Sequence, residues 1–98
     1  MNRQLRIRHE AVHDAIEAFS WYEAERPGLG REFEEALGST LDLLRQVPEA
    51  GPIVHRDVRR VVLRRFPYAV YYVLSSELID VRAVAHTHRD PGHWKKRA

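Results

Sequence analysis

Apolar residues recur every three or four positions in two stretches of the first half of the chain. This spacing predicts amphipathic helices over residues 9–26 and 30–47, each with one face toward a core. The breaker sequence Pro27-Gly28-Leu29-Gly30 separates them, so the two helices are expected to form an antiparallel hairpin. The first predicted stripe is Val12, Ala15, Ile16, Phe19 and Tyr22, and the second is Phe33, Ala36, Leu37, Thr40, Leu41 and Leu44.

One glycine interrupts the second helical stripe. Gly38 inside a helix costs about 1 kcal/mol relative to alanine. We expect either a close approach of the two helices at Gly38, which would offset that cost, or a local kink. Pro48 and Pro52 then end the helix and begin a loop.

The second half of the chain carries apolar runs of strand length. They predict strands over residues 58–66, 68–74 and 78–86, with Pro67 at the first corner and a short turn at 75–77. Both faces of the 68–74 strand are apolar, which predicts a central strand covered on both sides. The helical hairpin would provide one cover, and the C-terminal tail, another strand or a second protein the other.

A short strand is also predicted at the start of the chain, where Leu5 and Ile7 alternate with Arg6 and Arg8. The complete order is therefore one strand, a helical hairpin and a three-stranded antiparallel meander. This is an α+β fold in which the helices pack on one face of the sheet. A chain of 98 residues fits a single domain over residues 1–98.

Composition narrows the class of protein. Cysteine is absent, so the fold uses no disulfides and thiol chemistry is excluded. No apolar run reaches the ~18 residues that a membrane span requires, and the first residues lack the apolar segment of a signal peptide. These features predict a cytoplasmic protein without a membrane partner.

Charge is divided unevenly along the chain. Residues 1–54 hold 6 Lys/Arg and 10 Asp/Glu, a balance of −4, whereas residues 55–98 hold 10 Lys/Arg and 4 Asp/Glu, a balance of +6. This division predicts an acidic helical layer and a basic sheet surface. Solvated helix faces also collect glutamates without any functional reason, so both interpretations stay open.

The basic residues of the predicted sheet are candidates for binding an acidic target or partner. On a continuous strand, Arg60 and Arg64 would share one face, and Arg59 and Arg65 would share the other. Each arginine alone could equally be a solvated charge that protects a sheet edge. The full set expected to contact a target or partner is Arg59, Arg60, Arg64, Arg65, Tyr71, Arg82, Arg89 and Trp94.

Several C-terminal features occur together in a known toxin family. The corner Phe66-Pro67-Tyr68 is followed by the tail His86-x-x-Arg89-Asp90-Pro91-x-x-Trp94. With the order of elements described above, the chain resembles the RelE/ParE family of toxins from type II toxin–antitoxin systems over nearly its whole length. The resemblance implies a cognate antitoxin, a role in plasmid stabilisation, and either a homodimer or a toxin–antitoxin hetero-oligomer.

The resemblance leaves two activities open, because the family carries both on one fold. RelE-like members cleave mRNA on the ribosome and are metal-independent endoribonucleases. ParE-like members inhibit DNA gyrase and are not known as hydrolases. Whether the chain is an enzyme therefore depends on its site residues.

A ribonuclease of this kind needs particular chemistry. Cleavage beside a ribose 2′-OH requires a base for that hydroxyl, cations around the phosphate and an acid for the leaving oxygen. By resemblance to RelE-like members, Arg60 matches a basic residue of the first meander strand and Arg89 matches the C-terminal arginine. His88, or else His93, would serve as the terminal acid or base.

Two positions depart from the RelE-like pattern. Ala69 follows the strand-opening tyrosine where an arginine is expected, and Val62 stands where another cation is expected. Losing one such electrostatic contact typically costs ~10²-fold in rate, unless Arg64 and Arg65 replace the missing cations. The chain therefore resembles ParE-like members more than RelE-like ones. The function expected is gyrase inhibition and growth arrest, with no catalytic residues and no cofactor.

The histidine-rich tail superficially resembles a metal motif. His86, His88, Asp90 and His93 are similar to the histidine–aspartate cluster of metallo-β-lactamase-like hydrolases. The aspartate–histidine spacing differs, and that fold needs more chain and additional distant ligands. We therefore expect no native metal site.

The aromatic residues have two interpretations as well. Tyr72 is expected in the core, whereas Tyr71 either lines the opposite face or stacks on a base. Trp94 is expected to fold the tail back onto the sheet. Because Tyr22 continues the first helical stripe, Trp21 should be exposed; it is either a contact surface or an ordinary exposed aromatic.

Overall fold

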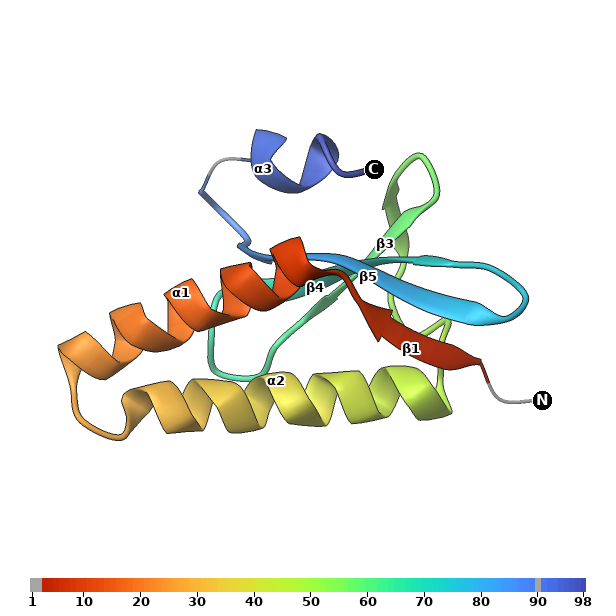
Figure 1. Cartoon of the computed structure of the whole chain (residues 1–98). Helices are drawn as coiled ribbons and strands as arrows, with labels where there is room; N and C mark the ends of the chain where they lie inside the picture. The colour runs from red at the N-terminus through yellow and green to blue at the C-terminus, as the bar shows by residue number, and fades with distance from the viewer. Residues whose placement is uncertain (1–2, 90) are drawn as a thin grey trace.

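The chain folds into two long helices and a sheet, with a short third helix at the C-terminus (Figure 1). The computed structural model describes residues 3–89 and 91–98. None of the helices in this described part is long and apolar enough to cross a membrane. The elements in order are β1 (Gln4–Ile7), α1 (His9–Glu25), α2 (Leu29–Gln46), β2 (Ile53–His55), β3 (Val58–Val62), β4 (Tyr68–Leu74), β5 (Leu78–His86) and α3 (Gly92–Lys95).

The sheet has five strands in the order β1-β5-β4-β3-β2. Strands β3, β4 and β5 form the predicted antiparallel meander, and the α+β fold class is confirmed. The N-terminal strand β1 pairs with β5 in parallel, with Gln4 opposite Leu78, so the sheet is mixed rather than fully antiparallel. Strand β2 was not predicted, because this edge strand has only three residues and follows Pro52.

The first meander strand is shorter than predicted. β3 ends at Val62 rather than at residue 66. The chain then turns, and Arg65 adopts the left-handed conformation with φ 68°, which a continuing strand does not contain. The predicted alternation of Arg64 and Arg65 between two strand faces is therefore wrong.

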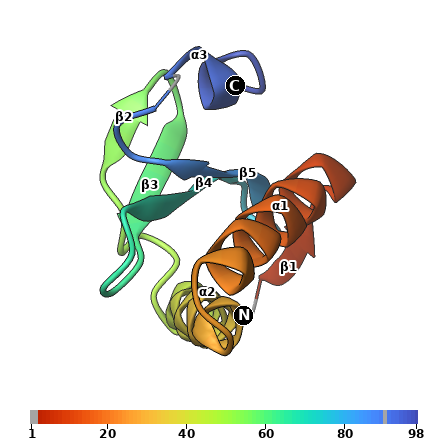
Figure 2. The ribbon, with the colours of Figure 1, turned by 90° about the vertical axis from the view of Figure 1, so that its left-hand side faces the viewer.

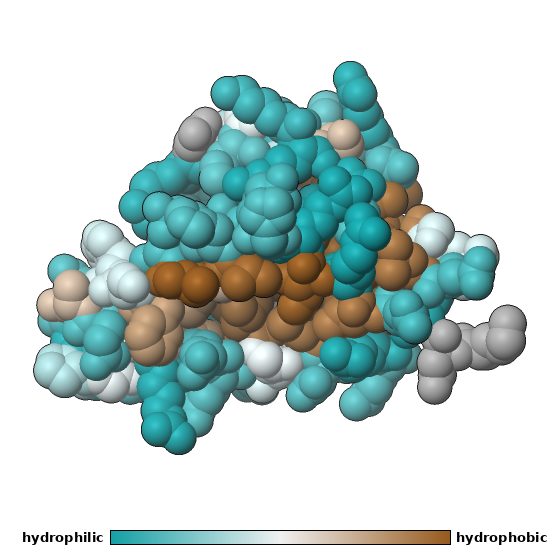
Figure 3. Space-filling model, viewed as in Figure 1, coloured by the Kyte–Doolittle hydropathy of each residue, from teal (hydrophilic) through white to brown (hydrophobic). Residues whose placement is uncertain are grey.

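Helix α1 faces the core with a different stripe from the one predicted. Its buried residues are Ala11, Asp14, Ala18 and Tyr22, whereas Val12 and Ile16 are 42% and 57% exposed. Small alanines allow the helix to lie close to the sheet, and Asp14 is drawn inward by charged partners described below. An apolar band consequently remains on the surface between the two long helices (Figure 3).

The close approach of the two helices occurs at Gly30 and not at Gly38. A Cβ on Gly30 would lie 2.8 Å from the carbonyl oxygen of Phe19 on α1, whereas a Cβ on Gly38 would meet nothing within 4 Å. The expectation that close packing explains Gly38 is therefore wrong. Gly30 allows α2 to begin directly against the end of α1.

The central strand β4 is covered on both faces, as predicted. Figure 2 shows α2 and α3 on opposite sides of strands β4 and β5. On the helix side Tyr72 is fully buried, and its hydroxyl donates to the carbonyl of Pro48 (2.7 Å). On the other side the C-terminal tail is the cover, because the Trp94 ring stacks on the Tyr71 ring at 4.4 Å. The main core beneath the helices contains Ala11, Ala18, Tyr22, Phe33, Leu44, Phe66, Val70, Tyr72, Ile79 and Val81.

Candidate functional site

Two of the predicted binding arginines are engaged inside the molecule. The Arg59 guanidinium donates to the carbonyl oxygen of Gly51 at 2.9 Å, and its side chain is 20% exposed. Arg82 lies where β5 bulges against β4; it donates to Asp80 at 2.9 Å and to the carbonyl oxygen of Arg97 at 2.8 Å. Both side chains therefore connect segments of the fold in this conformation.

Asp80 accepts hydrogen bonds from two arginines where β1 pairs with β5. Arg8 donates two hydrogen bonds to its carboxylate at 3.0 and 3.2 Å, and Arg82 donates one. Burial favours the neutral acid, but the hydrogen bonds and charges of these arginines outweigh it and lower the pKa of Asp80. The cluster therefore stabilises the parallel pairing of the N-terminal strand.

Arg60 lies on the sheet face that the helices do not cover. It is paired with Tyr71 across the β3–β4 ladder, and cross-strand partners share a face. On the same face Val62 is paired with Ala69. The two positions where a RelE-like enzyme would carry further cations are thus direct neighbours, and an apolar pair occupies them.

Tyr71 and Trp94 are both buried on this face, at 1% and 7% exposure. Their stacked rings form a second small core with Val58, Ala69, Ala83 and Ala85. In this conformation neither aromatic ring offers surface to a partner. Base stacking on Tyr71 would require the tail to leave.

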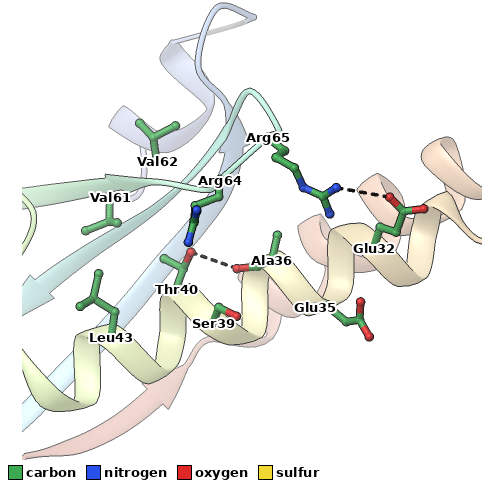
Figure 4. Close-up of a pocket in the computed structure, with 10 residues that line it drawn as sticks. All are labelled: Glu32, Glu35, Ala36, Ser39, Thr40, Leu43, Val61, Val62, Arg64 and Arg65. Carbon is green, nitrogen blue, oxygen red and sulfur yellow. Dashed lines mark hydrogen bonds and ion pairs between the residues drawn. The ribbon is translucent and has the colours of Figure 1, made fainter.

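Arg64 and Arg65 line a hollow of about 360 Å³ between α2 and the end of β3. Figure 4 shows both side chains directed toward α2, with Arg65 facing Glu32 at 3.7 Å. The apolar wall of this hollow includes Val61 and the 42% exposed Leu43, whereas the Val62 side chain points away from α2 (Figure 4). These arginines therefore do not fill the positions of the missing cations beside Arg60.

Arg89 lies at a different place, in a hollow of about 310 Å³ between α1, β4, β5 and the tail. Its guanidinium lies over the Trp21 ring at 5.8 Å and donates to the Tyr68 hydroxyl at 3.3 Å. Tyr68 belongs to the core beneath the helices, so this hollow opens on the helix side of the sheet. Trp21 is 50% exposed, and the prediction that it points outward is confirmed.

Two histidines extend this basic cluster. The His86 ring packs against Tyr68 at 5.3 Å, and its Nδ1 accepts a hydrogen bond from the His88 backbone N–H at 3.1 Å. Burial, with the positive charges of Arg89 and His88, lowers the pKa of His86. Burial first, and then the charge on Arg89, therefore favour the neutral form of the His86 ring.

A buried carboxylate, which sequence analysis did not single out, holds the tail. Asp14 on α1 accepts hydrogen bonds from Arg97 at 2.6 and 3.2 Å and from the Val84 backbone N–H at 3.0 Å. The His93 Nε2 lies 3.0 Å from the same carboxylate. The sequence did contain one indication that Asp14 is buried. It lies between Ala11 and Ala18, and these small residues mark the side of α1 that packs closely against the sheet.

On the other side of α1 lies an apolar groove, which we call the α1–α2 groove. It encloses about 230 Å³ and is lined from β1, α1, α2 and β5. Its walls and floor are Ile7, Ala11, Val12, Ala15, Ile16, Phe33, Glu34, Leu37, Leu41, Val81 and Val84. Val12 and Ile16 are exposed because the groove has no cover in the described chain.

The residues suggested for a ribonuclease are not gathered in one place. Arg60 lies on the face of Tyr71, whereas Arg89 contacts Tyr68 and Trp21 on the helix side. His88 is exposed beside His86, and His93 is engaged by Asp14. The structure thus brings His88 near Arg89 but leaves Arg60 apart from both.

The metal motif considered above falls partly on Asp90, which lies outside the described residues. Among the residues described, no group of three His, Asp or Glu side chains is arranged to hold a metal ion.

Sequence comparison gives consistent matches. A profile of the family described as "ParE toxin of type II toxin-antitoxin system, parDE" matches residues 5–91. Two proteins called "Toxin ParE2", from Mycobacterium tuberculosis strains CDC 1551 / Oshkosh and ATCC 25618 / H37Rv, are each 32% identical over 92 residues. The match covers 93% of this chain and 88% of each relative.

A solved structure has a similar fold. A chain from "Chromosomal ParDE TA system from P. aeruginosa" superimposes with a TM-score of 0.78 and 18% sequence identity. The alignment covers 88% of the present chain and 97% of that chain. At this identity the likeness concerns the arrangement of helices and strands.

Proposed function

We propose that this chain, which belongs to the family of ParE toxins from type II toxin–antitoxin systems, arrests growth by inhibiting DNA gyrase. The action would take place in the cytoplasm, where gyrase and its DNA are found. A cognate antitoxin would hold the toxin inactive, and the pair would serve plasmid stabilisation. The proposal rests on the family and on the absence of an assembled nuclease site in the described residues.

The observation that carries the proposal is the Val62–Ala69 pair beside Arg60. A phosphate-cleaving site depends on cations aimed at the developing charge. Here the neighbouring positions are apolar, Arg64 and Arg65 point toward α2 (Figure 4), and Arg89 lies on the helix side. An inhibitor needs only a binding surface, so this distribution of charge supports inhibition over catalysis.

The alternative is a ribosome-dependent mRNA interferase. The proximity of Arg89, His86 and His88 favours it, because this cluster combines a cation with two groups able to transfer protons. Such an enzyme would have to cleave without Arg60, and it would need the ribosome to supply the remaining contacts.

We further propose that the antitoxin places an amphipathic helix in the α1–α2 groove. Recognition of this kind requires a continuous apolar groove that accepts one face of a helix. The α1–α2 groove is bounded by two long helices, and its lining is apolar except for Glu34. An antitoxin helix with a continuous apolar face would complement this lining. The similar solved chain comes from a ParDE toxin–antitoxin system, which supports an antitoxin partner.

Two assays on one purified sample test the proposed function. The first measures supercoiling by gyrase, and the second measures mRNA cleavage on translating ribosomes. We expect inhibited supercoiling and intact mRNA, with DNA damage in arrested cells. Codon-positioned mRNA cuts with normal supercoiling would contradict the proposal and establish the interferase.

A further inference from the structure

The hollow around Arg89 combines residues that dominate protein–protein interfaces. Trp21, Tyr68 and Arg89 meet there, and Trp, Tyr and Arg are the residue types enriched among interface hot spots. Trp21 is 50% exposed although it lies against Tyr22 at 5.1 Å and beneath Arg89, so half of its side chain remains open to solvent. We call Trp21, Tyr68, His86 and Arg89 the Trp21–Arg89 surface.

Arg89 is available to bind an anion. Its hydrogen bond among the described residues is the one to Tyr68, and a guanidinium has five N–H donors. No described carboxylate lies within ion-pair distance of it, whereas Asp14, in the wall of the same hollow, is neutralised by Arg97. The guanidinium also lies over the Trp21 ring, 5.8 Å from its centroid, so a bound anion would lie beside an aromatic surface.

The surroundings favour a carboxylate of a protein over the backbone of a nucleic acid. Glu17 lines the same hollow, and its side chain is 70% exposed, whereas the charge of Asp14 is already paired with Arg97. A chain of phosphates passing through would meet this negative charge. A single carboxylate next to an aromatic or apolar side chain would reach Arg89 while its neighbour packs on Trp21.

We propose that the Trp21–Arg89 surface binds the target, and that it accepts an acidic residue followed or preceded by an apolar one on the target protein. This inference rests on the proposed function, since it assigns a surface to the inhibition of gyrase. The surface lies on the tail side of α1, whereas the α1–α2 groove lies on the other side of that helix. Target binding and antitoxin binding can therefore be separated by mutation.

The test compares the variants Trp21→Ser and Arg89→Gln with two matched controls. Arg45→Gln removes an exposed cation from the last turn of α2, and Ile53→Ser removes an apolar side chain that is 56% exposed on the edge strand. For each protein we would measure the concentration that halves gyrase supercoiling, neutralisation by the antitoxin, and the thermal unfolding midpoint. The site variants should need at least about tenfold more protein, as expected for interface hot spots.

The controls should stay within about twofold of the unchanged chain, and all four variants should keep their unfolding midpoint and their neutralisation by antitoxin. Undiminished inhibition by Trp21→Ser and Arg89→Gln would overturn the assignment while leaving the proposed function intact. An unchanged chain that does not inhibit gyrase would overturn both. Binding to single-stranded DNA or RNA that Arg89→Gln abolishes, with gyrase inhibition unaltered, would assign the surface to nucleic acid instead.

Discussion

Gly30 and Gly38 lie on the same helix, but only Gly30 packs against a neighbour. A Cβ on Gly38 meets nothing within 4 Å, and alanine is the better helix former by about 1 kcal/mol. We therefore predict that Gly38→Ala raises the free energy of unfolding by up to about 1 kcal/mol. Urea denaturation measures this change. Gly30→Ala is the control and should destabilise the protein, because its Cβ would meet the Phe19 carbonyl oxygen at 2.8 Å; equal effects of both variants would contradict the argument.

Asp14 supports the tail through charge. We predict that Asp14→Asn lowers the free energy of unfolding by about 2–3 kcal/mol, somewhat less than the ~3–5 kcal/mol of a fully buried pair, because Arg97 keeps 24% exposure. The loss should be accompanied by a change in Trp94 fluorescence, since the tail carries that ring. Glu17→Gln, one turn along α1 with a 70% exposed side chain, should change stability by less than about 0.5 kcal/mol. Similar losses in the two variants would argue against a specific role for Asp14.

Asp80 makes stability depend on pH. Its pKa in the folded protein lies below the ordinary value of 3.8, so the folded state binds this proton less readily than the unfolded state. The stabilisation is complete above that ordinary value and is lost as the pH falls through the lowered pKa. We predict that Asp80→Asn is less stable than the unchanged chain at neutral pH. As the pH falls below about 4, the variant should also lose stability less steeply than the unchanged chain. Thermal unfolding at a series of pH values measures both effects, and parallel curves for the two proteins would exclude the assignment.

At the scale of elements, the rotation of α1 has the largest consequence. By burying Ala11, Asp14 and Ala18, the helix leaves Val12 and Ile16 exposed in the α1–α2 groove. An apolar stripe normally indicates the core-facing side of a helix. Here the larger side chains surround a groove, and that is the feature on which the proposed antitoxin site depends.

We predict that Ile16→Glu prevents neutralisation by the antitoxin while gyrase inhibition persists. A charge within an apolar interface is costly, and we expect antitoxin affinity to fall by at least about tenfold. Ile53→Glu is a close match, because the two isoleucines are 57% and 56% exposed. Titration of antitoxin into the supercoiling assay measures the effect. Full neutralisation of Ile16→Glu would place the antitoxin elsewhere.

In the molecule as a whole, different elements cover the two faces of the sheet. The helical hairpin covers one face with a core that includes Tyr22, Phe33 and Tyr72. A tail of few residues covers the other through the stack of Trp94 on Tyr71 and the ion pairs of Arg97 and His93 with Asp14. The basic residues are consequently divided among both faces and the hollow beside α2, and this division is what weakens the case for a single catalytic centre.

The class of fold, the order of the main elements, the helical hairpin and the meander could be predicted from the sequence, because the periods of helices and strands are local properties. The sequence also indicated the central place of β4, the outward position of Trp21 and the burial of Trp94. The strand β2 escaped prediction because its three residues follow Pro52 and show no alternation, and α3 escaped because one helical turn is too short to show a helical period.

The buried side of α1, the packed glycine and the pairing of the arginines became visible in the folded chain alone. Each outcome depends on residues far apart along the chain: Asp14 and Arg97 are separated by 83 positions, and Arg8 and Asp80 by 72. The Val62–Ala69 pair likewise becomes one apolar spot only through the register of β3 with β4. The arginines were visible in the sequence, but the directions of their side chains were not. These directions follow from the bulge at Arg82, the left-handed turn at Arg65 and the contact of Arg97 with Asp14.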